Sequence, residues 1–492
     1  MEEQAKTIHT CLWIVGGVLA LLTLQIPLKD YIVDDAFIHL TFARNLSEGH
    51  GFSFNPGVPT YGVTAPLWTI LLALLSNIFV PGPALAKALS IICGVLTVPA
   101  FRLVAGTIGL TNRSANVATL IWALNVWLVR WTASGMEATL ALLLLILAFD
   151  AQIRFRSIAG LWLGLAMLCR PEAAVVAVVF ILDRWKTGSI SQALKLLAVI
   201  VLINLPWHIY ALSTFGTLRP NTVLVKGGFG LPVFSDFLLG IKRTLLIIGS
   251  GHGLETLVIL FGLILVIKRK LILSDFEIRT SALLVIWAIF PATIYLTQGV
   301  FVTSRYLLIG LPALTLLMFL ILDGLEYRRR LHIWRYGRYI LMAVIIIQQV
   351  FLTYKITLPH VEAFRPTIVV LKQIAEKLRQ ETSSGSSVAV GDVGVIGFYS
   401  RRYVVDIEGL ITREMVQYRA GISLDDLVLS GEYLRVHPVD YLIDKSMTPA
   451  RLADDEAGMY NVMFVEPIPG GLVDTADEQW YYTLYKIKKT AN

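Results

Sequence analysis

Charged residues are scarce in this chain. They make up 16% of its 492 residues, whereas hydrophobic residues make up 56%, and the mean hydropathy is +0.68. A soluble protein cannot bury that much apolar surface. The composition therefore excludes a soluble globular protein and predicts a polytopic α-helical membrane protein.

Cysteine is also rare, and histidine shows no metal-binding pattern. The cysteines lie in hydrophobic runs, which favours buried small apolar residues over disulfide partners or metal ligands; they are Cys11, Cys93 and Cys169. The following histidines lack the spacing of metal ligands and are interpreted as structural: His39, His50, His208 and His252.

Acidic residues are too few to balance the cations of the hydrophobic part. The net charge is +7, but acidic residues outnumber basic ones after His360, so the basic excess lies between the hydrophobic segments. Cations in such loops set membrane topology. This distribution explains the basic character better than nucleic-acid binding does, so we expect no nucleic-acid partner.

Hydrophobic segments separated by polar loops predict about eleven membrane spans, with a range of about 10 to 13. The N-terminal MEEQAKTIHT is too acidic for a signal peptide, so the first segment is expected to be retained. Two short runs, 66–80 and 237–248, are interpreted as re-entrant or interfacial. The expected spans are 11–28, 84–101, 115–131, 138–149, 158–169, 173–182, 194–212, 254–267, 282–296, 306–321 and 339–352.

Clusters of arginine and lysine orient these spans. By the positive-inside rule the clusters lie in the cytoplasm; they occupy 154–156, 184–186, 268–270 and 328–330. This orientation places the N-terminus in the cytoplasm. It places the first loop and the C-terminal part outside the plasma membrane.

The composition changes near Pro359, which predicts two domains. Residues 1–358 are expected to form the membrane domain, with its first outer loop at 29–65. Residues 359–492 are expected to form a soluble extracytoplasmic α/β domain of ordinary size. Its predicted elements are an amphipathic helix over 364–379 and strands at 387–390, 402–407, 440–443, 459–465 and 480–487.

The first outer loop carries adjacent carboxylates, Asp34 and Asp35, where the chain leaves the first span. Ionisable residues at membrane depth are costly and usually functional. One carboxylate could act as a general base while the other positions a substrate or cation. The alternative is helix capping, with Asp34 as N-cap and Asp35 in the first turn of a short interfacial helix. The two interpretations are compatible, because a cap holds a base in place.

Other charged residues lie near the outer side in this topology. Glu137 heads an apolar helix, either as a first-turn partner of the helix dipole or as a second carboxylate for a cation or sugar hydroxyl. Arg170 and Glu172 flank a proline between broken helices. They are interpreted either as part of a ligand site or as an ion pair with each other. Further cations suit either a lipid phosphate or headgroup snorkelling: Arg219, Lys226 and Arg305.

One glycine-rich stretch, GDVGVIG at 391–397, follows a predicted strand. It lacks the helix and distant acidic residue of a dinucleotide site. We therefore expect a turn that packs against the membrane part.

The order of motifs resembles the C-superfamily (GT-C) of integral-membrane glycosyltransferases. The match is DDAFIHLTFARNLSEGHGFSFNPG, followed by SGMEA, RPE, PNTVLVK, SRY and GDVGVIGFYS. The series looks like the subgroup containing the mycobacterial terminal arabinofuranosyltransferase and family 39-like bacterial sugar transferases; the aminoarabinose transferases of lipid A and the protein mannosyltransferases are more distant. One departure affects acceptor preference, because PTYGVTAPLW places Val63 and Ala65 where an acidic residue and more polar neighbours are expected.

The resemblance implies an inverting glycosyltransferase that uses a polyprenyl-phosphate sugar. It would transfer the sugar to a hydroxyl of a cell-envelope glycan, lipid or protein on the outer face. Asp34 would be the catalytic base with Asp35 beside it, and the donor phosphate would contact Arg170, Lys226 and Arg305. Candidates for binding substrate or a cation are Glu137, Glu172, His39, Arg44, Asn221 and Tyr61.

No cofactor is required by this chemistry. A divalent cation is compatible with it, and Asp34, Asp35 and Glu137 would then be its ligands. The alternative function is a lipid-linked sugar flippase or secondary transporter. Against it stand the odd number of spans, the lack of an inverted repeat and carboxylates at the membrane edge rather than its midplane.

Overall fold

The computed structural model describes residues 2–80, 82–227, 232–268, 271–329, 332–419, 422–453, 458–471 and 478–488. The chain forms two compact units. The first unit contains Met1–Lys29, Ala88–Trp207 and Gly230–Leu358. The second contains Asp30–Lys87, His208–Phe229 and Pro359–Asn492. The predicted first outer loop thus shares a unit with the C-terminal part; the predicted domain boundary at residue 358 stays a prediction.

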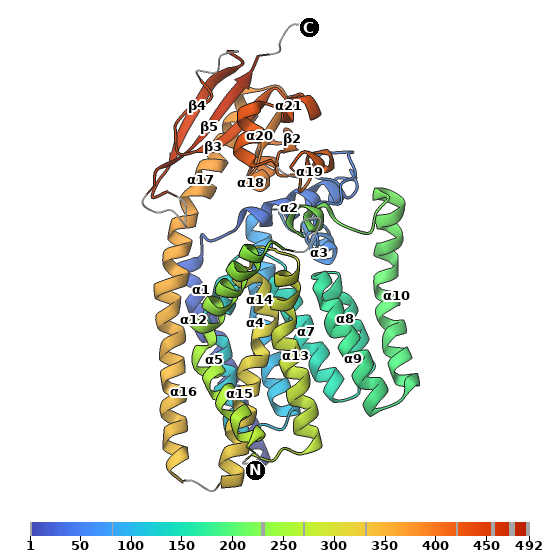
Figure 1. Cartoon of the computed structure of the whole chain (residues 1–492), viewed down its shortest axis with the longest axis vertical. Coiled ribbons are helices and arrows are strands. Elements are labelled where there is room, and N and C mark those ends of the chain that lie inside the picture. Colours follow the sequence, from blue (N-terminus) through green and yellow to red (C-terminus); the bar gives the residue numbers. More distant parts are fainter. Residues whose placement is uncertain are drawn as a thin grey trace. The chain divides into compact units, whose positions relative to one another are not determined.

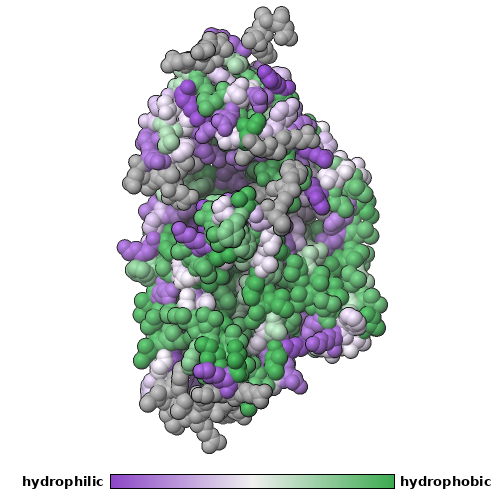
Figure 2. All heavy atoms as spheres, in the orientation of Figure 1, coloured by the Kyte–Doolittle hydropathy of each residue, from purple (hydrophilic) through white to green (hydrophobic). Residues whose placement is uncertain are grey.

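The first unit is helical. Seven helices in the described part of the chain are long and apolar enough to cross a membrane, and Figure 2 shows hydrophobic side chains gathered over the long helices. The helices with residues in this unit are α1 (Glu2–Gln25), α4 (Pro83–Thr107), α5 (Asn112–Ala123), α6 (Val126–Thr132), α7 (Ala138–Ile153), α8 (Ala159–Met167), α9 (Ala174–Thr187), α10 (Ile190–Phe215), α12 (Phe234–Ile267), α13 (Asp275–Thr297), α14 (Ser304–Leu307), α15 (Leu311–Arg329) and α16 (His332–Leu352).

The expected multi-span membrane architecture is confirmed, although the count of about eleven spans stays a prediction. The expected span 115–131 is wrong as one segment, because it is broken into α5 and α6. Asn125 causes the break: its side chain accepts hydrogen bonds from the backbone N–H groups of Trp127 and Leu128 and so caps a new helix.

The run at 237–248 and the expected span 254–267 both lie in α12, which consists of two helical segments joined at a kink. The helix is interrupted at His252, whose φ of −138° is not helical. The break frees backbone carbonyls, and buried side chains donate to them. The Trp127 Nε1 donates to the carbonyl of Ile247 (3.1 Å) and the Gln349 Nε2 to that of Gly251 (2.6 Å). The kink therefore leaves these polar groups satisfied.

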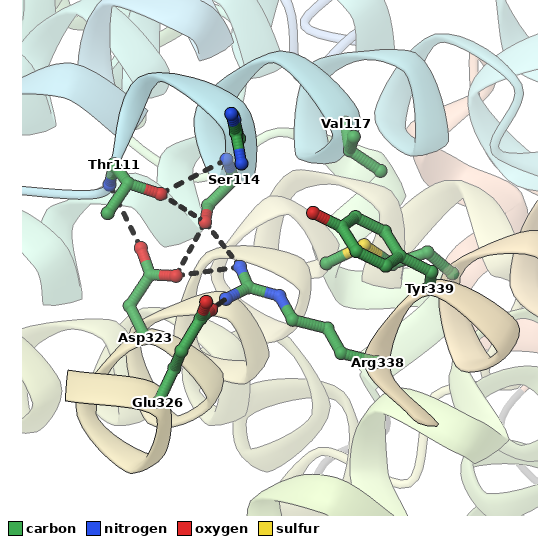
Figure 3. A pocket seen from close by; sticks show the side chains of 9 residues that line it. Thr111, Ser114, Val117, Asp323, Glu326, Arg338 and Tyr339 are labelled. Carbon is green, nitrogen blue, oxygen red and sulfur yellow. Dashed lines mark hydrogen bonds and ion pairs between the residues drawn. The ribbon is translucent and has the colours of Figure 1, made fainter. Parts of the chain in front are cut away.

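Arg338 joins three helices of this unit (Figure 3). From α16 its guanidinium contacts Asp323 (2.6 Å) and Glu326 (2.5 Å) on α15 and the Ser114 hydroxyl on α5. Ser114 also donates to Asp323 (2.5 Å). These residues border a cavity of about 300 Å³.

The second unit contains the predicted α/β domain, and the five strands among its described residues form one sheet in the order β2-β1-β3-β5-β4 (Figure 1). β1 pairs in parallel with β2 and β3, whereas β5 pairs antiparallel with β3 and β4. All five predicted strands are confirmed, with ends shifted by up to three residues. The strands are β1 (Ser387–Val390), β2 (Tyr403–Asp406), β3 (Tyr441–Ser446), β4 (Tyr460–Ile468) and β5 (Trp480–Ile487).

Helices complete the second unit. The predicted amphipathic helix at 364–379 lies within α17 and buries Leu371, Ile374 and Leu378. The prediction of a mere turn at GDVGVIG is wrong, because an eight-residue helix begins at Val393. The remaining helices are α2 (Asp34–Ser47), α3 (Pro66–Ser76), α11 (Asn221–Gly227), α17 (Leu358–Glu381), α18 (Val393–Ser400), α19 (Arg413–Arg419), α20 (Leu424–Ser430) and α21 (Tyr433–Val436).

Candidate active site

The predicted catalytic pair lies in the first turn of α2. The N-cap residue is Val33, which has extended backbone angles, so the alternative interpretation of Asp34 as the N-cap of this helix is wrong. Asp34 and Asp35 are both first-turn residues, where a carboxylate interacts favourably with the helix dipole. Both residues are partly exposed. The Asp34 side chain is therefore available to cap another helix.

That other helix is α18. The Gly394 N–H donates to Asp34 Oδ2 (3.0 Å) and the Val395 N–H donates to Asp34 Oδ1 (2.8 Å). These amides occupy the second and third positions of α18, which an N-cap side chain normally satisfies. Asp34 thus caps a helix 360 residues further along the chain.

Glycine permits this close approach. A Cβ built on Gly394 would lie 2.1 Å from the Asp34 carbonyl oxygen, and one built on Gly397 would lie 2.4 Å from the Phe54 ring. The i, i+3 spacing places both glycines on one face of α18. Gly394 and Gly397 therefore allow close helix packing within the second unit.

The electrostatic surroundings of Asp34 oppose its ionisation. Burial, the charge of Asp392 and the neighbouring charge of Asp35 raise the pKa of Asp34 to about 7, against the effect of the two backbone N–H groups. Burial acts in the same direction on Asp392, but the Lys445 ammonium and the Tyr482 hydroxyl lower the pKa of Asp392 below its ordinary value. Two neighbouring carboxyl groups are thus held in different protonation ranges.

Other predicted residues of the second unit make specific contacts. His39 is buried, and its Nδ1 lies 2.9 Å from the Thr69 hydroxyl. Arg44 donates to the backbone carbonyl of Phe398 on α18 (2.8 Å), and its guanidinium carbon lies 5.4 Å from the centre of the Phe398 ring. Burial, followed by the charge of Arg401, lowers the pKa of Arg44 to about 10. These contacts place His39 and Arg44 in the packing around α2.

Tyr61 and Asn221 meet at a backbone hydrogen bond. The Asn221 N–H donates to the Tyr61 carbonyl (2.8 Å), which fixes the start of α11. The Tyr61 ring stacks on Phe215 with ring centres 5.0 Å apart. Lys226 belongs to the same helix, but its side chain lies outside the described residues. The substrate-binding roles of these residues stay predictions.

The first unit brings together three other predicted residues. The Arg170 Nη2 lies 2.6 Å from Glu137 Oε1, and its Nη1 lies 3.5 Å from Glu172 Oε1. Tyr295 donates its hydroxyl hydrogen to Glu172. The side chains of Arg170, Glu137 and Glu172 are at most 8% exposed. Buried charges that pair in this way are strongly coupled.

Arg305 lies beside this cluster. Its guanidinium carbon is 5.2 Å from the ring centre of Tyr306 and 5.9 Å from that of Trp131. The guanidinium of Arg170 lies 5.3 Å from the same Tyr306 ring. Arg305 is partly exposed, unlike Arg170. The two arginines thus share an aromatic contact but differ in access to solvent.

Solved structures resemble this fold over most of the chain. The oligosaccharyltransferase of Archaeoglobus fulgidus is 15% identical with a TM-score of 0.56, over 89% of this chain and 69% of that one. ArnT from Cupriavidus metallidurans bound to undecaprenyl phosphate is 13% identical with a TM-score of 0.59, over 96% of this chain and 98% of that one. The chain has the GT-C fold.

Arabinofuranosyltransferase AftD from Mycobacteria also shares the GT-C fold, at 14% identity and a TM-score of 0.52. This similarity covers 98% of this chain but 42% of that one. Residues 360–485 match a family described as a domain of unknown function (DUF8728). No curated protein matches the chain.

Several residues of the site were not predicted from sequence. Asp392 lies within the GDVGVIG stretch, but Lys445 and Tyr482 carry no local signal, because the sheet alone brings them to Asp392. Tyr306 belongs to the SRY motif, whereas Tyr295 lies inside an apolar helix. Within the described ranges, no group of three or more His, Cys, Asp or Glu side chains could hold a metal ion, and the divalent cation stays untested.

Proposed function

We propose that this protein is an inverting membrane glycosyltransferase. It moves a sugar from a polyprenyl-phosphate donor to an acceptor hydroxyl at the outer face of the plasma membrane. The observation that carries the proposal is a GT-C fold whose first loop presents a carboxylate, Asp34, fixed by two backbone N–H groups. The undecaprenyl phosphate bound to ArnT supports a lipid-phosphate donor.

Asp34 is suited to act as a general base. Each carboxylate oxygen accepts one backbone hydrogen bond and keeps further acceptor capacity for the proton of a hydroxyl. A pKa raised to about 7 lies near the operating pH, where a base combines ionisation with proton affinity most effectively. Asp34 would remove the hydroxyl proton as the acceptor oxygen attacks the anomeric carbon.

The donor phosphate needs a cation that it can reach from outside the buried cluster. Arg170 contacts both Glu137 and Glu172, so an added phosphate would meet a locally anionic group. Arg305 is partly exposed and lies against aromatic rings. We therefore assign the phosphate contact to Arg305 and the organisation of its surroundings to Arg170, with Lys226 retained as a second candidate cation.

One base is sufficient for this reaction. The bond from the anomeric carbon to the phosphate oxygen breaks as the bond to the acceptor oxygen forms, and the phosphate leaves with the electron pair. Phosphate is a better leaving group than the alkoxide of glycoside hydrolysis, so a second acid is not required. Direct displacement inverts the anomeric configuration.

The test is sugar transfer by purified protein in detergent with a panel of polyprenyl-phosphate sugars. The variants are Asp34→Asn and, as the matched control on the same turn, Asp35→Asn. We expect product from the wild type, loss of at least about a hundredfold in Asp34→Asn, and a smaller effect in Asp35→Asn. Equal turnover in wild type and Asp34→Asn would exclude Asp34 as base, while donor movement across vesicles without transfer would favour a flippase.

A further inference from the structure

Asp392 occupies the N-cap position of α18 but does not cap its own helix. Aspartate is among the most favoured N-cap residues, because its carboxylate accepts from the second and third N–H groups of the helix. In α18 those two N–H groups are bound by Asp34 instead. Asp392, which its sequence position favours as the cap of α18, therefore does not bind these N–H groups.

The sheet holds the Asp392 side chain. The Lys445 Nζ lies 2.8 Å from Asp392 Oδ2, and the Tyr482 hydroxyl donates to the same oxygen at 2.5 Å. Lys445 on β3 and Tyr482 on β5 are direct partners in the antiparallel register. One cross-strand pair thus supplies both donors to a single carboxylate oxygen.

We propose that Asp392, Lys445 and Tyr482 are positioning residues, which keep the first turn of α18 free for Asp34. This inference deepens the proposed function, because it identifies what holds the base. Loss of the Lys445 cation would release Asp392 to bind the N–H groups of Gly394 and Val395. Asp392 would then displace Asp34, and the base would lose its fixed position.

The test reads these N–H groups directly by hydrogen–deuterium exchange of the full chain in detergent at pH 8, followed by residue-resolved mass spectrometry. Asp34→Ala is compared in four backgrounds, with the β5 strand amides as internal reference. In the wild-type background, Asp34→Ala should accelerate exchange at the Gly394 and Val395 amides about five- to tenfold, as expected for a lost cap. In the Lys445→Met background, Asp34→Ala should change the exchange rates of these two amides less than twofold, because Asp392 already caps the helix there.

A third background separates cap exchange from general weakening. In Lys445→Met combined with Asp392→Ala no competing carboxylate remains, so sensitivity to Asp34→Ala should return. Lys445→Arg keeps the cation and should behave like the wild type. The proposal would be overturned if Asp34→Ala accelerated amide exchange equally in the wild-type and Lys445→Met backgrounds. It would also be overturned if Asp34→Ala caused no acceleration in the wild-type background. If Asp34→Ala does not fold, Asp34→Asn replaces it, and only one of the two N–H groups should then exchange faster, because the amide oxygen still accepts a hydrogen bond whereas the amide nitrogen cannot.

Kinetics then connect the positioning to the reaction. Lys445→Met should lower kcat at least about tenfold with the donor KM unchanged, and Lys445→Arg should restore most of it. The exchange measurement needs no turnover. Absence of transfer with every donor would therefore contradict the proposed function and leave the cap arrangement standing, whereas an unchanged exchange pattern would contradict only the positioning.

Discussion

The Asp34 carboxylate and the Gly394 amide are joined by a 3.0 Å hydrogen bond, and no side chain fits between them. A Cβ on Gly394 would also lie 2.8 Å from Asp34 Oδ2. The candidate base and α18 are therefore coupled by close packing as well as by hydrogen bonds. A change as small as one methyl group tests this coupling.

Gly394→Ala should separate α18 from α2. The added methyl group would meet backbone atoms of Asp34, which cannot rotate away, so we expect a loss of about 1–3 kcal/mol in stability and a large loss of transfer activity. Thermal unfolding in detergent and the transfer assay measure both effects. Gly385→Ala is the matched control, because nothing lies within 4 Å of a Cβ at that position. Similar behaviour of the two variants would show that the close contact does not matter.

Transfer activity should depend on the ionisation of Asp34. Since a base must be deprotonated, kcat should fall as the pH drops below about 7. Asp392→Ala removes a charge that raises the pKa of Asp34, and it removes no cap from α18. Further titratable groups near Asp34 are Asp35 on the same helix, Lys445 on β3 and the neutral Tyr482 hydroxyl on β5, and they stay in place. The acid limb of the kcat profile should therefore move to lower pH, and a shift to higher pH would contradict this origin of the pKa.

The ionisation of Asp34 should also make the stability of the fold depend on pH. The pKa of Asp34 is raised in the folded state, from an ordinary value of 3.8 to about 7, so the folded protein binds this proton more tightly than the unfolded chain. Its favourable contribution is complete below about pH 4 and is lost as the pH rises to about 7. The stability of the wild type relative to Asp34→Asn should fall over this window. An advantage of the wild type that grows with pH would contradict the raised pKa.

Local patterns predicted the strands of the C-terminal domain and the amphipathic helix within α17, because alternation and helical spacing reflect burial directly. They did not predict α18, which is short and contains two glycines that propensity alone assigns to a turn. Its glycines make sense only against Asp34 and Phe54, more than 300 residues earlier in the chain. The break at Asn125 was also missed, since a capping side chain inside an apolar run does not alter hydropathy.

Some charged residues of the site could be predicted from the sequence, and others could not. The adjacent carboxylates at Asp34 and the Arg170–Glu172 pair were visible in sequence, because ionisable groups stand out among apolar segments. Their partners were not visible. Sheet register brings Lys445 and Tyr482 to Asp392, and helix packing brings Tyr295 to Glu172. The sequence therefore indicated where chemistry could occur, but not how its charges are balanced.

Arg170 and Arg305 should respond differently to loss of charge. Arg170→Met leaves the carboxylates of Glu137 and Glu172 buried without their cation, which should cost about 3–5 kcal/mol in stability. Arg305→Met should keep the fold and raise the donor KM about ten- to a hundredfold. Arg305→Lys should retain part of the affinity, since an ammonium still binds phosphate as a point charge. A stable Arg170→Met that cannot bind donor would instead identify Arg170 as the phosphate ligand.

Arg338 should be required for the packing of α5, α15 and α16 (Figure 3). Its side chain is 9% exposed and contacts Asp323, which is itself 12% exposed. Arg338→Met would leave Asp323 without its cation, and we expect a loss of about 3–5 kcal/mol. Arg338→Lys should restore only part of this, because one ammonium cannot reproduce the planar set of donors that reaches two carboxylates and a hydroxyl.

The matched control is Arg113→Met, which removes an exposed cation from the border of the same cavity. Unfolding of the full chain in detergent, followed by tryptophan fluorescence, measures all three variants. We expect less than about 0.5 kcal/mol for Arg113→Met, as for a typical surface position. Equal losses for the two methionine variants would mean that the helices are held by apolar contacts and that the ion pairs of Arg338 add nothing specific. The contrast between a buried and an exposed arginine at one cavity therefore isolates the contribution of the buried network.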